Sequence, residues 1–198
     1  MRLIIAAIVG TAIVFVWGGL AWMALGIWDD SVENLRPADA VMEAIAESVT
    51  EPGAYVFPPE PEVADPADEA AMTAATDAWM ARMDEGPTGV LLVHPKGIKG
   101  SMGMMFGMGL ALEFAGAMLM AILLSIAARA GCGVGGRVAV GAAIIGFAVL
   151  SGVIVPSNFM HHPAGWVRAM AGDLAIGWGL ATVVMAMIIK KPRTTRHT

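Results

Sequence analysis

Two carboxylates stand inside long apolar stretches of this 198-residue sequence. Glu113 is the one charged residue between positions 101 and 128, and Asp173 lies within the apolar stretch 166–189. A charged group at the centre of a bilayer costs at least about 2.5 to 3.5 kcal/mol, so it rarely faces lipid. Both carboxylates are therefore expected to point inward. Arg168, at the start of the second stretch, is a third intramembrane polar group and a candidate partner for either acid.

Small residues flank both acids at the spacing of one helical turn. Glu113 has Gly109 and Ala117 four residues to either side, and Asp173 has a small residue at the same two offsets. Small residues at this spacing let helix backbones approach closely enough for hydrogen bonds between helices. We interpret the carboxylates first as helix-packing and assembly groups. Two alternatives stay open, namely a proton relay or polar binding site, and pairing with another subunit.

Thioether and imidazole side chains gather near one end of these stretches, and both groups suit a soft metal such as Cu(I). The candidate metal-binding residues are Met104, Met108, Met160, His161, His162 and His94. The first two are four residues apart, which places their sulfurs on one helical face. Methionine is also a flexible filler between helices, and the chain contains 16 of them. No cofactor is therefore expected, with copper kept as the alternative.

The sequence lacks the short motifs of familiar catalytic sites. G-x-S-x-G, H-E-x-x-H, C-x-x-C and the phosphate-binding loop are all absent. The glycine-rich GCGVGG lies between two apolar stretches instead of following a strand. Cys132 is the only cysteine, so no disulfide can form within the chain. We expect a protein that is not an enzyme and has no nucleic-acid partner.

The composition indicates an integral membrane protein. Hydrophobic residues make up 57% of the chain, charged residues 15%, and the mean hydropathy is +0.69. Spanning a hydrocarbon core takes roughly 20 apolar residues in a helix. The sequence predicts helix 1 within 1–28, an acidic insertion at 29–100, helix 2 at 101–129, a Gly-rich loop at 130–137, helix 3 at 138–155, a loop at 156–165, helix 4 at 166–189 and a basic tail at 190–198.

Charge and aromatic residues predict how these helices are oriented. Arg129 and Arg137 bracket the Gly-rich loop, and the tail is basic, so the positive-inside rule places both in the cytoplasm. Four spans then place the N-terminus in the cytoplasm and residues 29–100 in the periplasm of a bacterium. Tryptophan favours the membrane interface. The predicted interface anchors are Trp17, Trp22, Trp28 and Trp166, with a ligand-binding role as the alternative for the first three.

The insertion at 29–100 is acidic and is expected to fold in part. It holds 15 of the 17 Asp and Glu residues of the chain. Apolar residues at helical spacing predict helices over 37–49 and 66–84. The segments 53–58 and 88–95 read as strands that could pair. Such a domain has a thin core, so we expect it to rest on the membrane helices or on a partner.

Several segments carry a resemblance that covers most of the chain. They are FVWGGLAW (15–22), DAVMEAI, GAYVFP, the Met-rich start of helix 2, and DLAIGWGLATVVMAMIIK (173–190). With these segments the chain resembles a loose family of uncharacterised bacterial four-helix inner-membrane proteins with a periplasmic insertion after helix 1. The resemblance implies topology and no activity, cofactor or site residue.

Taken together, we expect an all-α transmembrane four-helix bundle with a small α+β extracytoplasmic insertion. The expected role is a structural, assembly or accessory subunit in the inner membrane. Its partners would be the lipid bilayer and other membrane subunits or further copies of the chain. The alternative is a small transporter or copper-handling protein that uses the intramembrane carboxylates and the Met and His residues.

Overall fold

The computed structural model describes residues 1–190, and the chain forms two compact units. The first unit contains Met1–Glu33, Gly100–Ser157 and the chain from Pro163 onward, and the second contains Asn34–Lys99 and Asn158–His162. Lys191, Arg193 and Arg196 of the predicted basic tail lie outside the described residues.

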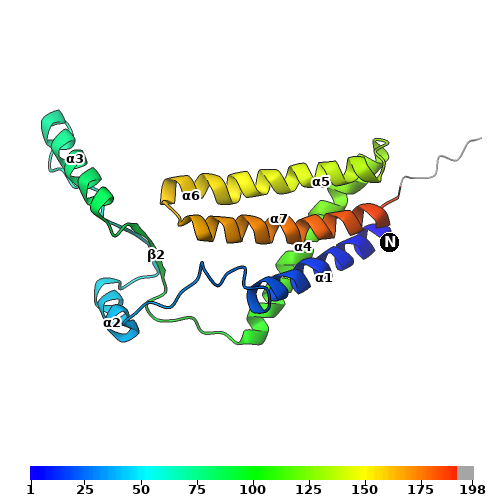
Figure 1. Ribbon diagram of the computed structural model, residues 1–198, viewed down its shortest axis with the longest axis horizontal. Helices are drawn as coiled ribbons and strands as arrows, with labels where there is room; N and C mark the ends of the chain where they lie inside the picture. The colour runs from blue at the N-terminus through cyan, green and yellow to red at the C-terminus, as the bar shows by residue number, and fades with distance from the viewer. Residues whose placement is uncertain (191–198) are drawn as a thin grey trace, which may run out of the picture. The chain divides into compact units, whose positions relative to one another are not determined.

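The first unit is built from long apolar helices (Figure 1). They are α1 (Arg2–Met23), α4 (Met102–Arg129), the continuous helix formed by α5 (Val134–Val149), η1 (Leu150–Ile154) and α6 (Val155–Met160), and α7 (Ala164–Ile188). The last three residues of α6 belong to the second unit. Four helices, 2–23, 102–129, 134–160 and 164–188, are long and apolar enough to cross a membrane. The prediction of four such helices is confirmed, and it indicates a multi-pass membrane protein.

Helix α7 lies between α1 and α5, and α4 runs obliquely across them to contact α1 and α5 (Figure 1). The core between these helices consists mainly of small and flexible apolar residues, among them Ala6, Ala121, Leu124 and Met185, which are each at most 1% exposed. Alanine and glycine keep helix axes close, so packing contacts replace the hydrophobic driving force that is missing between helices in lipid.

The third apolar helix is longer than its predicted span of 138–155, because it begins at Val134 and continues to Met160. The predicted span stops directly before Pro156. Proline lacks a backbone N–H and its ring clashes with the preceding turn. Here a π-helical turn, η1, comes directly before Pro156, and the Val155 N–H donates to the Leu150 carbonyl five residues back. This wider turn reorganises the hydrogen-bond ladder at the proline, so the helix continues.

Arg137 is also placed differently from its predicted position at a loop boundary. It lies in the first turn of α5, and its side chain is 4% exposed. Its Nε and Nη2 donate to the Ala186 carbonyl at 3.2 and 2.9 Å, and its Nη1 donates to the Cys132 carbonyl at 2.8 Å. Ala186 is in the last turn of α7, where carbonyls lack partners within the helix. The guanidinium therefore caps α7 and offsets the negative end of its dipole.

The second unit contains the predicted helices and strands with shifted ends. They are α2 (Ala38–Ser48), β1 (Gly53–Phe57), α3 (Glu69–Glu85) and β2 (Gly89–Val93). The strands pair antiparallel, with Tyr55 opposite Leu91. α3 starts later than predicted because Asp68 Oδ1 accepts the N–H groups of Ala70 and Ala71 and so forms its N-cap.

The second unit lacks a buried core within the part of the chain that is described. Val49, 5% exposed, is the one buried residue between positions 34 and 99, and α2 and α3 contain none. The sheet has two strands only. Isolated two-stranded sheets are marginally stable in water.

Candidate functional site

Asp173 and Trp17 join α7 to α1. The indole Nε1 of Trp17 donates to Asp173 Oδ1 at 2.7 Å and contacts the Asp173 backbone carbonyl at 3.1 Å. Gly177, one turn after Asp173, makes room for this indole: a Cβ at Gly177 would lie 2.6 Å from Trp17 Cδ1. The small residue next to the acid therefore admits an aromatic ring from α1, in addition to bringing two helix backbones together.

Glu113 of α4 lines the same cavity as Asp173. The cavity has a volume of about 340 Å³ and is bounded by α1, α4, α7 and the segment after α1. Glu113 is eleven residues into α4 and Asp173 is nine residues into α7, which puts them roughly 16 and 14 Å along their helices. Both side chains are half-buried.

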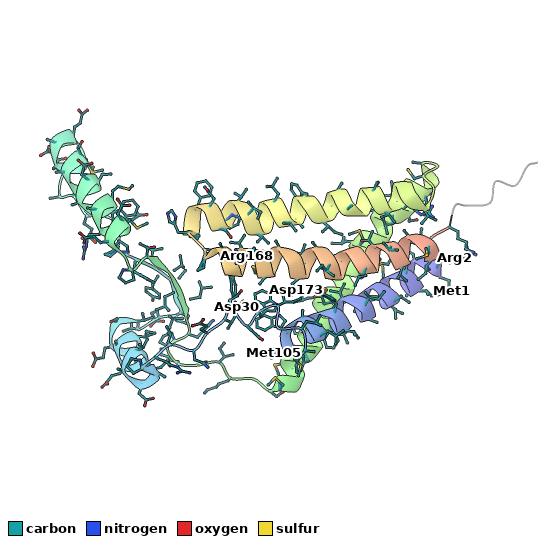
Figure 2. The ribbon with its side chains drawn as sticks, viewed as in Figure 1. Met1, Arg2, Asp30, Met105, Arg168 and Asp173 are labelled. Carbon is teal, nitrogen blue, oxygen red and sulfur yellow. The ribbon has the colours of Figure 1, made fainter. Side chains whose placement is uncertain are left out.

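Among residues 1–190, no basic side chain lines this cavity. Arg168, the predicted partner, also lies on α7, nearer its start (Figure 2), and its side chain is exposed. Within residues 1–190, neither Glu113 nor Asp173 forms an ion pair, and the only hydrogen-bond donor to a carboxylate of this pair is Trp17. An offset of five residues turns a side chain about 140° around a helix, which explains why Arg168 and Asp173 do not meet.

Tryptophan forms much of the cavity wall. Trp17, Trp22, Trp28 and Trp178 line it, together with Val14, Gly18, Met170 and Leu174. Trp28 is stacked on Trp22, with ring centroids 4.4 Å apart, and makes an edge contact with Trp166 at 5.3 Å. Trp28 is 5% exposed, and its buried Nε1 has no hydrogen-bond acceptor among the described residues.

These contacts bear on the predicted membrane-interface anchors. Trp17 and Trp28 are engaged with other side chains inside the first unit, and Trp166 packs on Trp28. Trp22 is 52% exposed, although its ring stacks on Trp28. Anchoring at the headgroup layer stays a prediction for all four.

The predicted metal-binding residues are divided between the two units. Met104 and Met108 lie one turn apart on α4 in the first unit, and their side chains are 68% and 61% exposed. The others, Met160, His161, His162 and His94, belong to the second unit. Among residues 1–190, no group of three or more His, Cys, Asp or Glu side chains could hold a metal ion. Copper binding by these six residues stays a prediction.

That tryptophans line the cavity was not predicted from the sequence. Trp178 was not assigned a role, and Trp17 was expected at the membrane surface. A usable signal was present, because Val14, Gly18 and Trp22 recur every four residues and so form one face of α1. Trp178 packs over α4 at Gly116, where a Cβ would lie 2.8 Å from its ring.

A comparison of the chain with protein-family models, curated proteins and solved structures finds no match. The resemblance drawn from the sequence therefore stays a prediction.

Proposed function

We propose that the chain is a multi-pass protein of a bacterial inner membrane that binds an organic cation within the membrane, as a small transporter for such cations must. In this proposal both termini are cytoplasmic and residues 29–100 are periplasmic. The positive-inside rule supports that orientation, because Arg129 lies at the end of α4 and Lys190 at the end of α7.

The observation that carries the proposal is a cavity with two carboxylates, no basic side chain and four tryptophans in its wall. A cation bound in the cavity is attracted to both carboxylates that line it. At 4 Å, the attraction between a cation and one carboxylate is worth about 4 kcal/mol at an effective dielectric constant of 20. The cavity volume of about 340 Å³ also falls in the usual range for small-molecule sites.

The aromatic wall favours an organic cation over a metal ion. Tryptophan is the best aromatic partner for a cation above its ring, and aromatic cages recognise quaternary ammonium groups. Hard metal ions instead require about six oxygen ligands. The bond from Trp17 to Asp173 fixes one carboxylate in place, which lowers the entropy lost when a cation binds.

The test is binding of tetraethylammonium to the purified full-length protein in nanodiscs, followed by tryptophan fluorescence. Glu113→Gln and Asp173→Asn keep the side-chain volume and remove one charge each. We expect each substitution to weaken binding about tenfold or more, from the lost attraction of one carboxylate. Asp77→Asn, on the exposed surface of α3, is the matched control and should change nothing.

Circular dichroism and gel filtration of each variant establish that it is folded. Absence of tetraethylammonium binding by the unmodified protein would overturn the proposal. The same holds if well-folded Glu113→Gln and Asp173→Asn proteins bind as tightly as Asp77→Asn.

A second proposed function is that of an accessory or assembly subunit, and the missing core of the second unit favours it. Val56 and Leu92 lie on the same face of the sheet and are 51% and 79% exposed. A small domain with one buried residue has little to stabilise it alone. In the first unit, a row of small residues on α4 is exposed as well, at Gly103, Gly107, Ala111 and Ala115.

Purification in a mild detergent tests this second function. A partner or a second copy should co-purify with the full chain. The association should weaken when 34–99 is replaced by a short Gly-Ser linker, if the second unit makes the contact. A monodisperse lone monomer from native membranes would contradict the accessory role.

A further inference from the structure

A cavity of about 200 Å³ lies within the second unit. Its wall includes one end of the sheet, where Phe57 of β1 lies opposite Gly89 of β2. Trp79 joins α3 to this end of the sheet, because its indole N–H donates to the Pro58 carbonyl at 3.4 Å. The segment 159–161 forms another part of the wall. This cavity shares no lining residue with the one that contains Glu113 and Asp173.

Two thioethers and one imidazole line this cavity, and they come from distant parts of the chain. Met83 is four residues after Trp79, so the two side chains lie on one face of α3. Met160 is the last residue of α6, and His161 follows it. Consecutive residues of an α-helix point about 100° apart. His161 leaves the helix with a φ of 50°, and this left-handed turn lets two consecutive side chains line one cavity.

The types of these side chains favour a soft metal ion. Thioether sulfur selects Cu(I), and imidazole also binds copper. Structural Zn²⁺ takes four ligands, mostly from Cys, His, Asp and Glu. No group of even three such side chains that could hold a metal ion is present among residues 1–190. The one carboxylate in the cavity wall, that of Glu60, attracts a cation electrostatically.

The size of the cavity also favours an ion over an organic molecule. Its volume of about 200 Å³ lies below the roughly 300 to 1,000 Å³ that is usual for small-molecule sites. Met160 is 46% exposed, so an ion can enter from solvent. The indole of Trp79 lies in the same wall, and the face of an indole ring attracts cations.

We propose that the second unit binds one Cu(I) ion through the sulfurs of Met83 and Met160 and the imidazole of His161. The site is distinct from the proposed site for an organic cation in the first unit. The sequence predicted the last two of these ligands and did not include Met83, because only the tertiary structure brings α3 to the end of α6.

Methionine also serves as a flexible apolar filler, so the experiment must separate packing from metal binding. Met83→Leu and Met160→Leu keep the volume and remove the sulfur. His161→Asn removes the imidazole, and asparagine tolerates the positive φ at this position. Met80→Leu, on the same helix but outside the cavity, is the matched control for the methionines. His94→Asn is the control for the histidine.

The full-length protein in nanodiscs is titrated into the coloured Cu(I) complex of bicinchoninate, without oxygen and with ascorbate present. We expect the unmodified protein to remove one Cu(I) per chain from the chelator. Loss of one ligand should weaken Cu(I) binding at least about tenfold, because even partners outside the first coordination shell contribute about 10- to 100-fold to metal affinity. Both controls should bind Cu(I) like the unmodified protein. X-ray absorption at the copper edge should show sulfur ligands.

Circular dichroism and gel filtration establish that each variant is folded. Failure of the unmodified protein to take Cu(I) from bicinchoninate would overturn the proposal. So would folded Met83→Leu, Met160→Leu and His161→Asn proteins that bind Cu(I) as tightly as the controls, or bound copper without sulfur ligands. Glu113→Gln should leave Cu(I) binding unchanged, so this proposal and the one for the organic cation fail separately.

Discussion

The two units of this chain stabilise their helices in different ways. Helices of the first unit bury a shared core of alanine, leucine and methionine, and α7 contacts helices on both sides. Helices of the second unit have no buried residue, and the hydrogen bonds of Thr73 and Thr76 in α3 are local. In the first unit the helices depend on contacts between distant residues, whereas in the second unit the pairing of β1 with β2 and the bond from Trp79 to the Pro58 carbonyl are the contacts between distant residues that stand out.

The two units also differ in how they accommodate charged side chains. Exposed carboxylates of the second unit need no partner because water solvates them. In the first unit, Arg137 is bonded to carbonyls and Asp173 to an indole, while Glu113 faces the same cavity without a hydrogen-bonding partner among residues 1–190. In the first unit, the charged side chains Arg137, Asp173 and Glu113 therefore belong either to a helix cap or to the candidate site.

The largest effect is expected from the cap on α7. Arg137→Met should lower the free energy of unfolding of the first unit by about 3 kcal/mol, because the charged hydrogen bonds to two carbonyls are lost. Thermal melting in detergent measures the change. Arg129→Met, at an exposed position, is the control and should cost less than about 1 kcal/mol. Equal melting temperatures for the two variants would mean that the cap is not important.

A smaller loss is expected where α5 approaches α7. A Cβ at Gly141 would clash with the Thr182 side chain, which is 1% exposed and has little room to move. Gly141→Ala should therefore destabilise the first unit by about 2 kcal/mol through overpacking. Gly146→Ala on the same helix meets no atom within 4 Å. It should be neutral or slightly stabilising, because alanine is the better helix former.

The bond between α1 and α7 is expected to contribute less again. Trp17→Phe keeps an aromatic ring and removes the N–H that Asp173 accepts, which should cost about 1.5 kcal/mol of stability. If Asp173 is held for ligand binding, tetraethylammonium affinity should fall in the same variant. Trp79→Phe makes the same change in α3 of the second unit, outside the cavity, and serves as the control. Unchanged stability and affinity in Trp17→Phe would show that the bond is dispensable.

The smallest effect is expected in the second unit. Asp68→Ala removes the N-cap of α3 and should cost about 1 kcal/mol locally. Hydrogen exchange of α3 amides should accelerate about fivefold, with no shift in the melting of the first unit. Asp77→Ala, in the interior of α3, leaves the cap intact. A shift in the first unit's melting caused by Asp68→Ala would show that the two units are energetically coupled.

The elements were largely predictable, and their contacts were not. Length and hydropathy are local properties, so the four long apolar helices and both short strands could be read from the sequence. Continuation of the third helix through Pro156 could not be predicted, because it depends on the π-helical geometry of the preceding turn. Arg137 is predicted at the end of the Gly-rich loop because the positive-inside rule counts basic residues near helix ends. That rule does not say which backbone carbonyls their side chains bond.

The candidate site was predictable in the same partial sense. Glu113 and Asp173 stand out because a carboxylate in an apolar stretch is costly and rare. The surrounding tryptophans cannot be recognised as site residues from the sequence, because an indole suits a membrane interface as well as a protein core. Only the tertiary arrangement of α1, α4 and α7 brings Trp17, Trp28 and Trp178 to one cavity.

The π-helical turn η1 (Leu150–Ile154) changes the direction in which the residues after it point around the helix axis. One additional residue in a turn rotates all that follows by about 100° relative to an uninterrupted α-helix. Ser157, which is 8% exposed, owes its buried direction to this rotation. Deleting Gly152 would realign the helix and turn Ser157 outward. The direction of α6 is thus set by the length of one turn, independently of which side chains it carries.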